Sequence, residues 1–276
     1  MACTTIRIAE RAATRETGAS TQSFSRSLQW LRGRHWWREV LIVGSLYVLY
    51  ELARGLVSAD FDVVLDNGFQ LLRWEDVLHL DPEHALNNAL VHLTPLAVLC
   101  SYYYAALHYV VTPVVLVWMY RRHAADYGWA RNWIIASTVL GLIGYITVPT
   151  APPRLLPGSG FHDTLAAVHQ YGWWGSEASV PRGFGGLADS FAAMPSLHVG
   201  WALWVGVLLW RFARRGWVRV LGVLYPVATT FVVMATGNHY LFDALAGAAT
   251  MGVGAVLARG VLSIRNHLVM TRMLKA

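Results

Sequence analysis

The chain has 276 residues, of which 55% are hydrophobic and 14% are charged, and its formal net charge is +6 at pH 7. A soluble domain carries roughly 25% charged residues, so this composition excludes an ordinary soluble protein and predicts an integral membrane protein. The basic residues lie near the ends of apolar stretches, which argues against nucleic acid as a partner and favours contact with anionic membrane lipids.

The N-terminal 37 residues are rich in Arg, Ser and Thr and lack an apolar segment followed by a small-residue cleavage site. We expect residues 1–37 to form a flexible cytoplasmic tail and not a cleaved signal peptide. Residues 38–265 are then one helical membrane domain, and residues 266–276 are a cytoplasmic C-terminal tail.

Several stretches of this domain are apolar over about 20 residues, the length that a helix needs to cross the hydrocarbon of a bilayer. They lie near residues 39–58, 94–120, 132–149, 194–212, 217–236 and 241–262. The sequence therefore predicts an all-α fold, a polytopic membrane helical bundle with about six transmembrane helices. If these spans alternate in direction, 18 of the 22 basic residues fall on one side, which the positive-inside rule assigns to the cytoplasm. We therefore expect a multi-pass protein of the cell membrane with both termini cytoplasmic.

Two segments on the extracytoplasmic side separate the spans. In the first, Leu65, Phe69 and Leu72 have helical spacing, which is typical of a helix in the headgroup region. A second helix is predicted to begin at Asp81, with Pro82 in its first turn. The other segment, residues 150–192, is punctuated by Pro and Gly, which predicts a loop or lid, although an ordinary connector fits the composition equally well.

Ionisable residues occur at the start of two apolar spans, in AMPSLHVGWALW (193–204) and TGNHYLFDALAG (236–247). The predicted topology brings Ser196, His198, His239 and Asp243 to the same extracytoplasmic face. His239 and Asp243 are four residues apart, so on a helix they share a face, where the carboxylate can fix the imidazole tautomer and leave Nε2 free to react. Singly, each feature also fits an interfacial histidine or a local hydrogen bond, but ionisable residues beside membrane spans are candidates for function.

These residues carry a resemblance to a known family. MPSLH followed by HYLFD resembles the second and third signature motifs of the type 2 phosphatidic acid phosphatase superfamily. The sequences PTAPPR, AMPSLHVGWALW and GNHYLFDALAG are most similar to its inositol phosphorylceramide synthase-like branch. The resemblance covers about residues 90–260. It implies that His239 attacks phosphorus to form a phosphohistidine, that Asp243 orients His239, that His198 protonates the leaving oxygen and that Ser196 contacts the phosphoryl group.

The chain departs from the superfamily pattern at its phosphate-binding positions. Val232 and Val233 stand where the third motif has Ser and Arg, and the first motif has no matching Lys. By resemblance Arg154 replaces these cations, helped by Arg182, which also fits an ordinary surface arginine. Asn238 is a further candidate to bind phosphate, although it could instead cap the last helix.

No cofactor or metal is expected. His79, His84 and His92 lack a compact ligand motif, so a zinc site is not predicted. His108 and the tyrosine run 102–104 in the second span either line a lipid-facing groove or pack the bundle.

The predicted function is that of an integral-membrane lipid phosphatase or phosphotransferase acting on a phosphorylated lipid or isoprenoid. Hydrolysis and transfer differ only in whether water or an alcohol acceptor attacks the phosphohistidine. The alternatives are an inositolphosphotransferase-like transfer of a phospho-head group to an alcohol and, from a different class, a non-catalytic lipid transporter or lipid-phosphate binder. A transporter would need a polar path to the inner face, and the third, fifth and sixth spans have few polar residues there.

Overall fold

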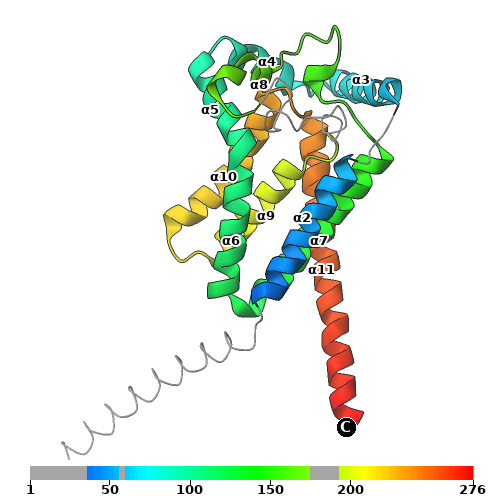
Figure 1. Cartoon of the computed structure of the whole chain (residues 1–276), viewed down its shortest axis with the longest axis vertical. Coiled ribbons are helices and arrows are strands. Elements are labelled where there is room, and N and C mark those ends of the chain that lie inside the picture. The colour runs from blue at the N-terminus through cyan, green and yellow to red at the C-terminus, as the bar shows by residue number, and fades with distance from the viewer. Residues whose placement is uncertain (1–35, 56–59, 175–192, 276) are drawn as a thin grey trace, which may run out of the picture. The chain divides into compact units, whose positions relative to one another are not determined.

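The computed structural model describes residues 36–55, 60–174 and 193–275, and these are predominantly helical with no β-strand among them (Figure 1). The predicted all-α fold is therefore confirmed. The chain divides into two compact units, residues 1–48 and 49–276. In the first unit the described part is the beginning of helix α2 (Trp36–Gly55), and everything that follows concerns the second unit.

The second unit contains the remaining helices and short helical turns. In chain order these are α3 (Phe61–Leu78), α4 (Pro82–Val91), α5 (Thr94–Tyr102), the π-helical turn η1 (Tyr103–Leu107), α6 (His108–Arg122), α7 (Ala124–Thr147), η2 (Pro153–Leu155), α8 (Thr164–Ala167), η3 (His169–Tyr171), α9 (Leu197–Phe212), α10 (Gly216–Ala235) and α11 (Leu241–Lys275).

Among the residues that the structure describes, three helical segments are long and apolar enough to cross a membrane: Thr94–Arg122, which joins α5, η1 and α6, then α10, and then Leu241–Val261 of α11. They match three of the six predicted spans. The other predicted spans are helical but do not reach the same criterion. Helix α9 has only 16 residues, a length of about 24 Å, so it is short for a span. In α7, polar or small residues such as Arg131, Asn132 and Gly144 lower the mean hydropathy. Six spans are therefore not confirmed.

The two helices predicted between the first and second spans are both present. Asp60 precedes α3, and its side chain accepts a hydrogen bond from the Asp62 N–H at 3.2 Å, as expected of an N-cap. Helix α4 begins at Pro82, directly after Asp81. Leu65, Phe69 and Leu72 of α3 are partly buried against an apolar cluster, which includes Val64, Ala151 and Tyr240.

Small residues allow the long helices to approach closely. Gly206 of α9 lies against the Gly222 carbonyl of α10, and Gly254 of α11 lies against Ser137 of α7. Gly247, in the second turn of α11, lies against the Ser196 carbonyl at the start of α9. Contacts between small residues are a common way of joining membrane helices, and here they bring the first turns of α9 and α11 together.

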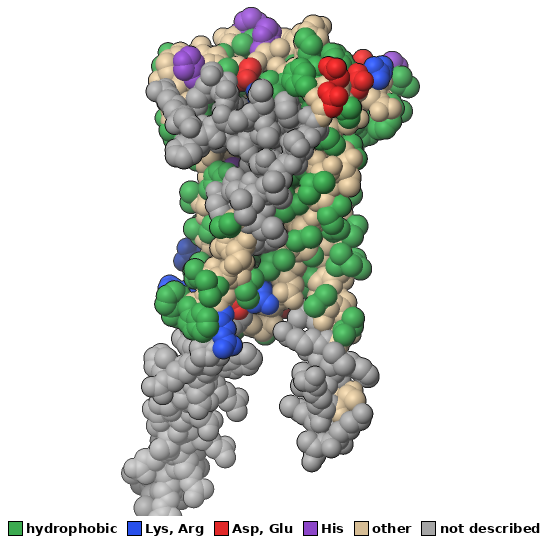
Figure 2. All heavy atoms as spheres, turned by 45° about the vertical axis from the view of Figure 1, so that its right-hand side comes forward, with side chains coloured by type: hydrophobic (Ala, Val, Ile, Leu, Met, Phe, Trp, Pro, Cys, Tyr) green, Lys and Arg blue, Asp and Glu red, His purple; other side chains and the backbone are tan. Residues whose placement is uncertain are grey.

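The two ends of the second unit differ in side-chain chemistry. Helices α3, α4 and α8 lie at one end, together with the starts of α9 and α11 (Figure 1). We call this the histidine end, because it holds His198 and His239. The α6–α7 and α9–α10 connections lie at the opposite end, which we call the arginine end because Arg121, Arg122, Arg214 and Arg215 are exposed there. In Figure 2, exposed apolar side chains cover much of the visible surface between the two ends.

Candidate active site

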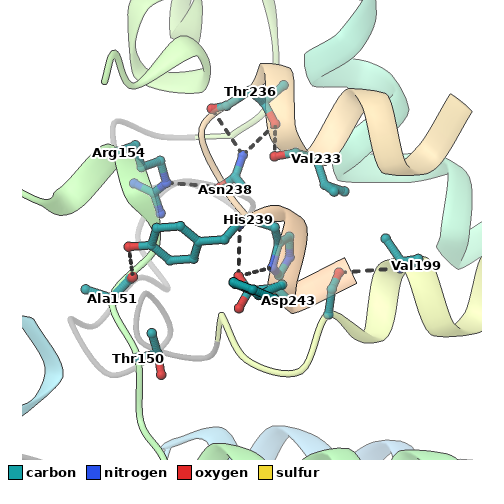
Figure 3. Close-up of polar contacts among 12 residues, drawn as sticks. Thr150, Ala151, Arg154, Val199, Val233, Thr236, Asn238, His239 and Asp243 are labelled. Carbon is teal, nitrogen blue, oxygen red and sulfur yellow. Dashed lines mark hydrogen bonds and ion pairs between the residues drawn. The ribbon is translucent and has the colours of Figure 1, made fainter. Parts of the chain in front are cut away.

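The His239–Asp243 pair lies buried at the start of α11 (Figure 3). His239 is 3% exposed and Asp243 is fully buried, and His239 Nδ1 lies 3.3 Å from Asp243 Oδ2. The same carboxylate oxygen accepts a hydrogen bond from the Tyr240 N–H at 3.1 Å. Asp243 therefore caps the first turn of α11 and contacts the imidazole at the same time, so the helix start fixes the position of the pair.

A tight turn between α10 and α11 holds the backbone of His239. The N–H groups of Asn238 and His239 both donate to the Val233 carbonyl, each at 3.1 Å. Gly237 has φ +71°, and a Cβ there would lie 3.0 Å from the His162 carbonyl oxygen and 3.2 Å from Arg154 Cβ. Because the left-handed conformation and this crowding both favour glycine, Gly237 lets the turn approach the 150–163 segment closely.

Arg154 is joined to this turn by two hydrogen bonds and to Asp163 by an ion pair. Its N–H donates to the Gly237 carbonyl at 3.0 Å, its Nε donates to Asn238 Oδ1 at 3.0 Å (Figure 3), and its Nη1 pairs with Asp163 Oδ2 at 2.8 Å. The Arg154 side chain is 4% exposed. The structure thus places Arg154 beside the histidine turn, with Asp163 offsetting its charge.

Asn238 bridges Arg154 and the end of α10, and it does not cap the last helix. Its Nδ2 donates to Thr236 Oγ1 at 2.9 Å, while α11 begins at Leu241 with Asp243 serving the first-turn N–H. Asn238 therefore orients the guanidinium of Arg154 and leaves the capping of α11 to other residues.

Ser196 and His198 lie at the start of α9, next to the start of α11. The Ser196 hydroxyl accepts from the Val199 N–H at 3.4 Å as the N-cap of α9, and the Ser196 N–H donates to the Asp243 carbonyl at 2.9 Å. The ring centroids of His198 and His239 are 5.9 Å apart. The two histidines therefore come from different helices and meet at one site.

His198 is surrounded by aromatic side chains of the segment η1–α6. Its ring stacks on Tyr104 at a centroid distance of 4.5 Å and meets the His108 ring edge-on at 4.3 Å. His108 is 7% exposed, so it packs inside the bundle and does not line a lipid-facing groove. These contacts restrict the orientation of the His198 ring.

The sequence analysis missed three buried polar residues, Glu75, Glu83 and Asn87, each with no exposed surface. Asn87 Nδ2 donates to the His162 and Ala235 carbonyls at 3.0 and 2.9 Å, so it ties α4 to the 150–163 segment and to the end of α10. The positions of these three residues on their helices could have indicated that they are buried.

On α3, Glu75 continues the buried stripe of Val64, Gly68 and Leu71, and on α4, Glu83 and Asn87 share the buried face of Leu90. A polar residue at an apolar position of such a stripe is a candidate for a specific buried contact.

The structure does not test the remaining candidates. Arg182 lies outside the described residues. Among the residues that the structure describes, no three His, Cys, Asp or Glu side chains gather in an arrangement that could hold a metal ion. A metal-independent reaction remains a prediction.

Comparison with known proteins gives one match. A family model described as the PAP2 superfamily matches residues 69–257, which is more than half of the chain and includes every candidate site residue named in this section. No curated protein and no solved structure matches the chain significantly.

Proposed function

The chain belongs to the PAP2 superfamily, and from this premise we propose that it is a membrane lipid phosphatase that works through a phosphohistidine on His239. The observation that carries the proposal is the approach of His198, on α9, to the His239–Asp243 pair on α11, with 5.9 Å between the ring centroids. A phosphoryl group near both rings can be attacked by one imidazole while its leaving oxygen takes a proton from the other.

The first half-reaction uses both histidines. Asp243 holds the proton of His239 on Nδ1, so Nε2 carries the lone pair that attacks phosphorus. The bond between phosphorus and the lipid oxygen breaks, and protonated His198 gives its proton to that oxygen. In the second half-reaction a water oxygen attacks the phosphohistidine, the P–N bond breaks and His198 takes the water proton. Free phosphate leaves, and both histidines return to their starting states.

Arg154, Asn238 and Ser196 support the phosphoryl group in this proposal. Asn238 and Asp163 hold Nε and Nη1 of Arg154, and Nη2, which has no hydrogen-bond partner among the described residues, is the donor we assign to a phosphate oxygen. Phosphoryl transfer depends mainly on positioning and on charge stabilisation, so a fixed guanidinium suits the reaction. We extend the same role to Arg182.

The finer assignment, to the inositol phosphorylceramide synthase-like branch, is also a proposal. In that case an alcohol replaces water in the second half-reaction, and a phospho-head group is transferred. Val233 supports a departure from the phosphate site of the wider superfamily, because it is 1% exposed in an apolar cluster where that pattern has Arg. The phosphate-binding cation must then come from another position, and we assign this role to Arg154.

The apolar helices and the family membership indicate a membrane protein. We further propose that the histidine end faces outward and the arginine end faces the cytoplasm, since exposed arginines favour the cytoplasmic side. A Cys introduced at the exposed Gln170 should react with an impermeant maleimide in intact cells. Labelling only after permeabilisation would reverse the orientation.

Phosphate release tests the function. The purified protein is incubated with phosphatidic acid, isoprenyl phosphate and isoprenyl diphosphate, beside His239→Ala. Release by the wild type and a loss of at least about a thousandfold in the variant are expected of a nucleophile deletion. Equal release by both proteins would refute the role of His239. A wild type that releases phosphate only when an alcohol acceptor is added would identify a transferase, and lipid binding without turnover would favour the non-catalytic alternative.

A further inference from the structure

Two carboxyl groups are buried together at the histidine end, and among the described residues no basic side chain contacts them. Glu75 lies in the last turn of α3 and Glu83 in the first turn of α4, and both have no exposed surface. Glu75 and Glu83 are within hydrogen-bonding contact of each other. Burying two unpaired negative charges side by side is costly, so the pair needs a proton.

The hydrogen bonds of the pair show where the proton belongs. Glu75 Oε1 accepts from the Phe242 N–H at 2.7 Å. For Glu75 Oε2 and both oxygens of Glu83, no N–H or O–H donor is present among the described residues. A neutral carboxyl accepts through its carbonyl oxygen and donates through its hydroxyl, so a proton on Glu75 Oε2 gives Glu83 a donor while Oε1 keeps Phe242.

The positions of the two acids on their helices support the same assignment. Glu75 lies at the C-terminal end of α3, where the helix dipole opposes a negative charge, and Glu83 lies at the N-terminal end of α4, where the dipole favours one. Burial and the neighbouring Glu83 raise the pKa of Glu75 to about 10. Glu75 is then the neutral member of the pair at physiological pH.

The bond from Phe242 connects this pair to the candidate active site. Phe242 precedes Asp243, and its N–H is one of the first-turn donors of α11 that lack a partner within the helix. Glu75 therefore holds the turn that carries Asp243 and, through it, His239. The acids near the pair are Asp243 on α11 and Asp81 before α4. With both glutamates ionised, their charge would repel the Asp243 carboxylate.

We propose that Glu75 and Glu83 share one proton and act as a positioning pair, which fixes the first turn of α11 through Phe242 and keeps an additional negative charge away from Asp243. The positioning role rests on the proposed function of His239 and Asp243. The shared proton does not, because it follows from the geometry of the two carboxyl groups alone.

The experiment uses the full-length protein in detergent and has two readouts. The infrared carbonyl stretch of a neutral carboxylic acid reports the shared proton, and kcat and KM for phosphate release report the positioning. The variants are Glu75→Gln, which keeps an acceptor for Phe242 and an N–H donor for Glu83, and Glu75→Leu, which keeps neither. Asp76→Asn is the matched control, since Asp76 is the adjacent, exposed acid on the same helix.

We expect the infrared band in the wild type and in Asp76→Asn but not in Glu75→Gln. Glu75→Gln should keep kcat within about threefold, and Glu75→Leu should lower kcat at least about tenfold with a smaller change in KM, because a shift of the α11 turn misplaces His239. A wild type without the band, or a band that survives in Glu75→Gln, overturns the shared proton.

The positioning role has its own contrary outcomes. It is overturned if Glu75→Leu turns over like the wild type, or if Glu75→Gln loses as much kcat as Glu75→Leu. The Gln variant keeps the test decisive even if Glu75→Leu does not fold. If the wild type releases no phosphate from any lipid, the proposed function fails, and the infrared arm still decides whether the proton is shared.

Discussion

The arginine end and the histidine end of the same helical unit bury different kinds of side chains. Towards the arginine end, a cluster of large apolar side chains that includes Met119, Tyr127, Trp204 and Leu208 fills the space between α6, α7 and α9. Its polar atoms are few and bond to nearby backbone, as Trp204 Nε1 does to the Ala130 carbonyl at 2.9 Å. Dense packing of this kind fixes helices relative to one another and offers no reactive group.

At the histidine end, charged and polar side chains take the place of that apolar cluster. His239, Asp243, Glu75 and Glu83 are buried there, and Arg154 is paired with Asp163. A buried polar group is costly unless it is paired, so each pairing restricts where its partners can lie. The contrast shows that one end supplies stability to the bundle, while the other uses that stability to hold a reactive arrangement in place.

The largest expected effect is a loss of turnover when the histidine end is altered. Asp243→Asn should lower kcat by about a thousandfold, because a neutral amide lacks the negative charge that holds the His239 proton on Nδ1, and the imidazole loses its fixed tautomer. Single-turnover phosphate release measures the loss. A variant with wild-type kcat would show that Asp243 only caps α11.

A substitution at the arginine end should have the opposite signature. Trp204→Ala removes a fully buried ring and a hydrogen bond to Ala130, and it should destabilise the protein by about 3 kcal/mol while the folded fraction keeps its kcat. Thermal unfolding in detergent measures the loss, and Trp210→Ala is the control because Trp210 is 58% exposed on the same helix. Equal destabilisation by the two variants would remove the distinction between buried packing and membrane-exposed surface.

A further expected effect is a change in the pH dependence of stability. Because the pKa of Glu75 is raised from 4.5 to about 10, the folded chain holds a proton between these values that the unfolded chain has released. Stability therefore falls as pH rises through this window, by up to about 1.4 kcal/mol per pH unit for one group. Glu75→Gln should remove this slope.

Unfolding temperatures of the wild type and Glu75→Gln at pH 5.5, 7 and 8.5 measure that difference in slope, with Asp76→Asn expected to follow the wild type. Parallel slopes in all three proteins would mean that Glu75 titrates like an exposed acid. The histidine end would then lack the buried proton that we propose for the Glu75–Glu83 pair.

Local spacing was enough to predict part of the fold. The spans near 94–120, 217–236 and 241–262, the helix that carries Leu65, Phe69 and Leu72, the helix start at Asp81, and the shared face of His239 and Asp243 all follow from patterns over a few residues. The hydrocarbon core and the helical repeat impose these patterns on each segment separately, so the segments can be recognised without knowledge of their neighbours.

Other features depend on which segments meet. Three sets of hydrogen bonds join distant parts of the chain. Glu75 bonds to Phe242, Arg154 bonds to Asn238, and Asn87 bonds to the His162 and Ala235 carbonyls, which are 75 and 148 positions further along. Read along the sequence, Glu75 and Glu83 look like exposed acids on amphipathic helices, and only their places in the buried stripes suggest otherwise.

The sequence by itself therefore determined an apolar, helical membrane protein with a histidine and an aspartate one turn apart. Tertiary structure decided what surrounds that pair: Tyr104 and His108 beside His198, Asp163 on Arg154, and two buried glutamates behind Asp243. The physical reason is that spacing within a helix is set by the backbone, whereas the partner of a buried charge is set by how the helices pack.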